Sequence, residues 1–205
     1  NLIAVGLAQH LTPGDEILIS VAEHHANFVP WQQIALKTGA VFNVFDVRED
    51  GSYDTDDFAR KLNAKTKIVA LSHMSNVLGV VNPLTHLIDM AHAVHAVVVV
   101  DCAQSIAHMP VDARALNADF LVFSGHKLYG PTGIGILAGT DEMLDALPPY
   151  QFGGDMVRSV RIKETDFAAP PVKFEAGTPP FAEAIALSES ITYVRKIGFD
   201  KIMAR

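Results

Sequence analysis

The sequence has one cysteine, little charge and no long apolar segment. A single cysteine, Cys102, excludes an internal disulfide. The most apolar run, residues 97–100, ends at Asp101, and no run reaches the roughly 20 residues of a membrane-spanning helix. The net charge of -7, without a basic stripe, argues against a partner that is nucleic acid. With no basic region at the start of the chain to suggest a signal peptide, we expect a cytoplasmic protein.

Hydrophobic residues make up 49% of the chain, and apolar runs alternate with helical spacing through residues 15–100. Such alternation indicates βαβ units and a mainly parallel sheet with helices on its faces. We predict strands at residues 16–21, 40–47, 67–72, 97–101, 120–124 and 135–138. We predict helices at residues 1–11, 29–38, 54–62, 83–96 and 182–197.

We predict that residues 1–205 form part of one large domain. Residues 1–150 would be its α/β core, and residues 151–181, rich in Gly and Pro, an extended loop segment. Residues 182–205 would begin a helix that leads toward a smaller domain. Because the chain opens without Met and both ends interrupt helical patterns, we expect an interior piece of a longer protein.

A lysine and an acid each follow an apolar, strand-like run. Lys127 comes directly after residues 120–124 and before a glycine-rich turn, and Asp101 follows four valines. Pyridoxal phosphate needs such a pair, because a lysine amine binds it covalently and a carboxylate keeps its pyridine nitrogen protonated. The alternatives are a surface lysine in a turn and an aspartate that caps a helix.

Other polar residues also follow predicted strands: His24, Asn76 and Gln104. Because ligands of parallel sheets bind beyond the carboxyl ends of the strands, we expect these residues near Lys127 and Asp101. His24 could stack on an aromatic ring or be a solvated loop histidine. The neighbouring histidines at residues 24–25 also suggest a metal, but few acids lie nearby, so we expect none.

Hydroxyl and imidazole groups at Ser124, His126 and Thr178 suit a phosphate. A nucleotide-binding loop is disfavoured, because Lys127 precedes the glycines instead of following them. Cys102 directly follows an acid, which would raise the pKa of its thiol, and we interpret it as a small buried residue.

Together these motifs resemble the class V aminotransferase-fold enzymes, and within them the SufS-type cysteine desulfurases and selenocysteine lyases. The resemblance spans nearly the whole chain. Its most specific segments are residues 23–27, 75–79, 100–104, 124–135 and 174–179. It implies the three-layer large domain of fold-type I pyridoxal phosphate enzymes.

The resemblance also implies roles around the cofactor ring. Lys127 would bind the cofactor and remove the substrate Cα proton, and His24 would stack on the ring. Asp101 would pair with the ring nitrogen, and Gln104 and Asn76 would lie near the ring oxygen.

Further implied roles concern the phosphate and the partner subunit. Ser124 and His126 would bind the phosphate, and Thr178 would reach the phosphate of a neighbouring subunit in a homodimer.

The implied reaction converts L-cysteine to L-alanine and delivers a persulfide, through an acceptor protein, to iron–sulfur cluster assembly. The family's sulfur-accepting cysteine and carboxylate-binding arginine lie in a later domain, so we expect residues 1–205 alone to be inactive. The alternatives are a selenocysteine lyase, an aminotransferase, a kynureninase-like lyase and a non-catalytic scaffold.

Overall fold

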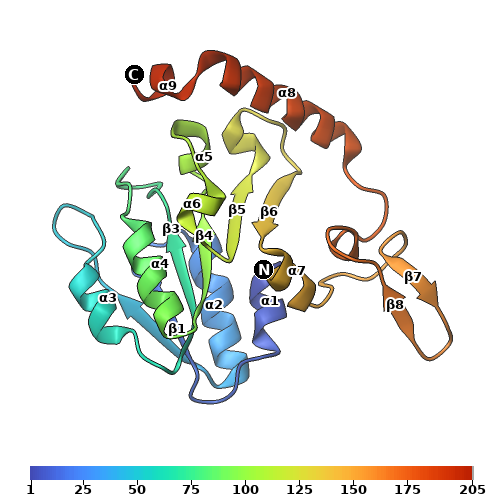
Figure 1. The fold of residues 1–205 in the computed structure, drawn as a ribbon, viewed down its shortest axis with the longest axis horizontal. Coiled ribbons are helices and arrows are strands. Elements are labelled where there is room, and N and C mark those ends of the chain that lie inside the picture. The colour runs from blue at the N-terminus through green and yellow to red at the C-terminus, as the bar shows by residue number, and fades with distance from the viewer. Residues whose placement is uncertain (205) are drawn as a thin grey trace.

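A computed structural model describes residues 1–204 and shows a six-stranded sheet with helices on both faces (Figure 1). The strand order is β2-β1-β3-β4-β5-β6; the first five strands are parallel, and β6 is antiparallel to β5. The predicted fold class is therefore confirmed. The strands are β1 (Glu16–Ser20), β2 (Val41–Phe45), β3 (Thr66–Ser72), β4 (Val97–Asp101), β5 (Phe120–Ser124) and β6 (Gly135–Gly139). The helices that accompany this sheet are α1 (Leu2–Ala8), α2 (His25–Thr38), α3 (Thr55–Lys61), α4 (Leu84–Ala93), α5 (Ser105–His108), α6 (Ala113–Leu116) and α7 (Asp141–Ala146).

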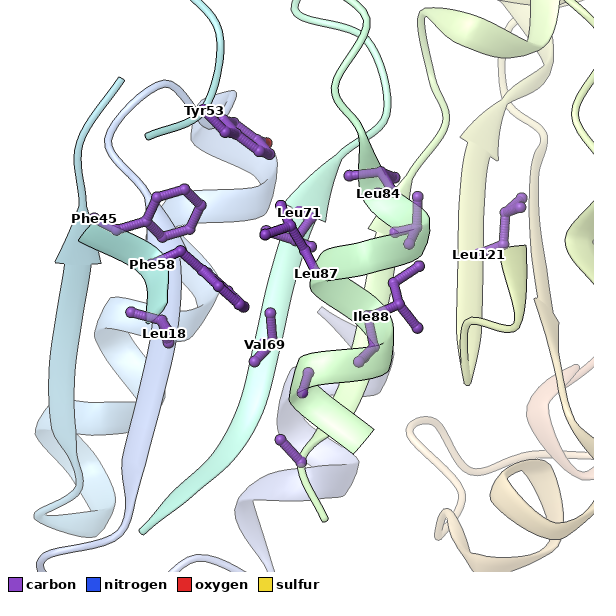
Figure 2. Packing of buried hydrophobic residues seen from close by; sticks show 14 of the residues in the cluster. Leu18, Phe45, Tyr53, Phe58, Val69, Leu71, Leu84, Leu87, Ile88 and Leu121 are labelled. Carbon is purple, nitrogen blue, oxygen red and sulfur yellow. The ribbon is translucent and has the colours of Figure 1, made fainter. Parts of the chain in front are cut away.

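Each face of the sheet carries its own hydrophobic core, because successive side chains of a strand point to opposite faces. On one face Leu18 and Val69 pack with Leu87 of α4, as Figure 2 shows. On the other face Ile17 packs with Ile34 of α2. Burial on both sides explains why the strands are almost continuously apolar, and it leaves polar side chains to the strand ends.

Three predicted helix boundaries were wrong by three residues or more. The first helix, predicted at residues 1–11, ends at Ala8. Helix α2 begins at His25 and not at residue 29, because the His24 side chain caps it by accepting a hydrogen bond from Ala26 N at 3.1 Å. Helix α4 ends at Ala93 and not at residue 96, since His95 has a φ of 63°.

The segment predicted as an extended loop, residues 151–181, contains a hairpin. Strands β7 (Val157–Val160) and β8 (Thr165–Phe167) pair antiparallel, and a short 3-10 helix, η2 (Val172–Phe174), follows. The mostly exposed hairpin strands carry charges, so their sequence lacks the apolar alternation of a half-buried strand.

Helix α8 (Phe181–Ile197) confirms the last predicted helix, and Gly198 separates it from α9 (Phe199–Met203). Leu187 and Val194 of α8 form a third apolar cluster with Ala107 and Leu128. In Figure 1 α8 lies across the end of the sheet where β5 meets its following turn. The helix therefore packs against the segment that carries Lys127 and stabilises it.

Candidate active site

A cleft of about 430 Å³ lies at the carboxyl ends of β4 and β5, beside the start of α2. This size falls within the ordinary range of small-molecule sites. The parallel strands bring their polar terminal residues to this one edge of the sheet. The cleft is lined by His24, Ala26, Asn27, Asp101, Ala103, Val122, Phe123, Ser124, His126 and Lys127. Five of the eight residues predicted from the sequence thus meet in one cleft.

Lys127 lies in a tight turn, the 3-10 helix η1 (Gly125–Leu128) that follows β5. Gly125 N donates to Ile134 O at 2.9 Å, and Gly130 N donates to Gly125 O at 3.0 Å. A Cβ at Gly125 would lie 2.8 Å from the Ile134 side chain, and one at Gly130 would lie 2.8 Å from Gly125 O. The two glycines let the backbone fold back closely enough to direct the lysine segment to the cleft.

Asp101 is the last residue of β4, and it is half-buried at the opening of the cleft. Its Oδ1 accepts a hydrogen bond from Ala103 N at 2.8 Å, which fixes the carboxylate close to its own backbone. No salt bridge joins Asp101 to Lys127 within residues 1–204. The carboxylate and the ammonium therefore line one cleft without neutralising each other directly.

His24 lines the same cleft and also caps α2. Because its Nδ1 accepts from Ala26 N, the neutral ring carries its proton on Nε2. The rings of His24 and His25 are 6.1 Å apart and tilted by 41°. Residues 1–204 contain no group of three or more His, Cys, Asp or Glu side chains that could hold a metal.

Ser124 and His126 flank Gly125 at the end of β5, and both line the cleft. Ser124 is half-buried and His126 is exposed. A hydroxyl and an imidazole on either side of one glycine can both donate hydrogen bonds to an anionic group, as the sequence predicted for this segment.

Three predicted site residues lie outside the lining of this cleft. Asn76 is exposed in the loop after β3, and Gln104 is half-buried directly before α5. Thr178 lines a separate cavity of about 480 Å³, together with the segment around Gly133 and Ile134. The roles expected for these three remain predictions.

Sequence reasoning missed Asn27, which lines the cleft, and its buried partner Glu23. Asn27 Nδ2 donates to Glu23 Oε2 at 2.7 Å, and Trp31 Nε1 donates to Asn27 Oδ1 at 3.1 Å. Glu23 also accepts from Ser72 and Tyr53. Burial raises the pKa of Glu23, against the opposing effect of these donors. Two signals were available: an acid that closely follows an apolar strand, and the place of both residues in segment 23–27 of the resemblance.

Cys102 is fully buried in the core beneath the cleft. Burial, with a smaller contribution from Asp101, raises the pKa of its thiol to about 12. The thiol is therefore protonated at neutral pH, which confirms its interpretation as a structural residue.

The fold and the sequence both resemble those of known enzymes. The sheet and its flanking helices match the large domain of fold-type I pyridoxal phosphate enzymes. The chain belongs to the aminotransferase class-V family, whose model matches residues 1–205. No helix within residues 1–204 combines the length and apolarity needed to cross a membrane.

Similar proteins include a probable cysteine desulfurase of Mycolicibacterium paratuberculosis, which is 49% identical over 205 residues; the match covers 100% of this chain and 30% of that protein. The crystal structure of the cysteine desulfurase CsdA from Escherichia coli superposes with a TM-score of 0.95 at 41% identity, and covers 98% of this chain and 50% of that one. A C-DES variant with glycine covalently linked to its PLP cofactor has a TM-score of 0.85 at 26% identity, and covers 96% of this chain and 54% of that one. The chain thus spans between about a third and a half of the length of these relatives.

Proposed function

We propose that the protein is a pyridoxal phosphate-dependent cysteine desulfurase that converts L-cysteine to L-alanine. The observation that carries the proposal is the single cleft that contains Lys127, Asp101 and His24. The similarity of the chain to proteins named cysteine desulfurase supports L-cysteine as the substrate. Residues 1–205 would supply the cofactor-binding part of the active site.

The residues that line the cleft suit three parts of pyridoxal phosphate: the aldehyde carbon, the pyridine nitrogen and the phosphate. The Lys127 amine would bind the cofactor covalently, and the Asp101 carboxylate would hold a proton on its pyridine nitrogen. The His24 ring would cover one face of the cofactor, with Nε2–H free to donate. Ser124 and His126 would donate hydrogen bonds to the phosphate.

Bound pyridoxal phosphate supplies an electron sink for the substrate Cα. Lys127 Nζ, released when the substrate amine replaces it on the cofactor, would take the Cα proton, and the Asp101 carboxylate would hold the proton on the pyridine nitrogen. The narrow turn held by Gly125 and Gly130 would keep the amine within reach, so that positioning contributes to the rate.

We further infer that the complete protein is a cytoplasmic homodimer that passes sulfur as a persulfide to an acceptor protein for iron–sulfur cluster assembly. Thr178 would reach the phosphate held by the neighbouring subunit, and Asn76 and Gln104 would contact the cofactor ring once it is bound. The exposed position of Thr178 on a loop is consistent with an intermolecular role.

The test is alanine release from L-cysteine by the complete protein loaded with pyridoxal phosphate. Lys127→Arg should abolish turnover, because arginine stays protonated and cannot act as the base. Lys65→Arg is the matched control, since Lys65 is exposed and lies outside the cleft. Full activity of Lys127→Arg, or release from L-selenocysteine alone, would contradict the proposal.

A further inference from the structure

A buried hydrogen-bond cluster, hereafter the Glu23 cluster, lies behind the cleft and joins four parts of the fold. Glu23 follows β1, Tyr53 precedes α3, Ser72 ends β3, and Asn27 and Trp31 belong to α2. All five residues are buried. Asn27 is the only member of the cluster that lines the cleft. The cluster therefore connects the sheet to the cleft wall.

Both oxygens of Glu23 face donors. Ser72 N donates to Oε1 at 3.0 Å, and Tyr53 OH also donates to Oε1. Asn27 Nδ2 and Ser72 Oγ donate to Oε2 at 2.7 and 2.5 Å. A hydroxyl can rotate to accept instead, but a backbone N–H cannot.

The orientation of the Asn27 amide is fixed by Trp31. An indole N–H can only donate, so Asn27 must present Oδ1 to Trp31 and Nδ2 to Glu23. Asn27 Nδ2 therefore needs an acceptor on Glu23, and Ser72 N, which also donates to the Tyr53 hydroxyl at 2.9 Å, faces the other Glu23 oxygen at 3.0 Å. A carboxylate accepts from both, whereas a carboxamide of the same shape turns its NH₂ toward one of these two donors.

Asn27 and Glu23 also flank His24 along the chain. Asn27 N donates to His24 O at 2.7 Å, so the backbone of His24 is held at the first turn of α2. The His24 ring is held by its own cap to Ala26. Because Glu23 also holds the Asn27 side chain, the hydrogen bonds fix the conformation of residues 23–27 at the cleft.

We propose that Glu23 is a positioning residue that acts through Asn27 to hold His24 and the adjacent cleft wall in the geometry that binds the cofactor. The inference rests on the proposed function. Glu23 touches no reacting atom, and its part is to supply two acceptors where the fold presents two fixed donors.

The test measures pyridoxal phosphate affinity and the induced circular dichroism of the bound cofactor in the complete protein. Glu23→Gln keeps the shape but sets a carboxamide NH₂ against either Asn27 Nδ2 or Ser72 N. We expect affinity to fall about tenfold, as for a buried donor without an acceptor, with a changed dichroic band. Asp57→Asn is the matched control, because Asp57 is equally buried on α3 and accepts from Lys61 and Arg60 outside the cleft. It should leave both readings unchanged.

The decisive variant is the double substitution Glu23→Gln with Trp31→Phe. Phenylalanine has no N–H, so Asn27 is free to turn its Oδ1 toward the new carboxamide. We expect the double variant to bind the cofactor more tightly than Glu23→Gln alone, even though losing the indole lowers the melting temperature. If the two substitutions weaken binding additively, or Glu23→Gln binds like wild type, the positioning role is wrong. If wild type itself fails to bind the cofactor at Lys127, the proposed function is what fails.

Discussion

Gly130→Ala should destabilise the turn that carries Lys127 by steric overlap with the backbone. The added Cβ would lie 2.8 Å from Gly125 O and 2.9 Å from Leu187 Cδ1. The leucine tip can move, but Gly125 O is held by the hydrogen bond from Gly130 N at 3.0 Å. The turn itself therefore has to open.

The size of the effect follows from two opposing contributions. Overpacking a tight site costs about 1–3 kcal/mol. Alanine lowers the entropy of the unfolded chain relative to glycine, which returns about 0.4–1 kcal/mol. The middle of the two ranges leaves a net loss of about 1.3 kcal/mol, which for a chain of this size lowers the melting temperature by about 3–5 °C.

Thermal unfolding followed by circular dichroism measures this difference, with Gly154→Ala as the control. A Cβ at Gly154 would meet nothing within 4 Å. This variant should melt at or slightly above the wild-type temperature. If Gly130→Ala melts together with Gly154→Ala, the close approach of Gly130 to Gly125 does not constrain the turn as described.

Two further predictions concern buried groups. Burial lowers the pKa of His73 in the folded protein. Below about pH 6.5 this imidazole therefore binds a proton in the unfolded chain more readily than in the folded one. The free energy of unfolding should therefore fall as the pH drops from 7 toward 5, and urea titrations of His73→Gln should show a shallower fall; an unchanged slope would refute the assignment. The Cys102 thiol, buried with its pKa near 12, should resist iodoacetamide in the folded protein and react after denaturation. Rapid labelling under native conditions would mean that this part of the core opens readily.

The parts of the fold that depend on local pattern were predictable. The valines before Asp101 and the apolar run before Ser124 identify β4 and β5, and the parallel arrangement then brings their ends to one edge. The sequence offered no signal for the order of the strands, because that depends on which faces the helices cover.

The Glu23 cluster could not have been predicted in the same way. Its contacts join residues 49 positions apart, such as Ser72 and Glu23, and no local periodicity encodes them. The start of α2 was missed for a different reason, because histidine is not among the residues that typically cap a helix. The long-range hydrogen bonds are resolved only when the tertiary structure is known.

The central claim is that the Lys127 amine is the group in this cleft that binds pyridoxal phosphate. Borohydride reduction of the loaded complete protein, followed by peptide mapping, tests it most directly. We predict a single stable label on Lys127, which is lost in Lys127→Arg and kept in Lys65→Arg. A label on a different lysine, or none, would contradict the account.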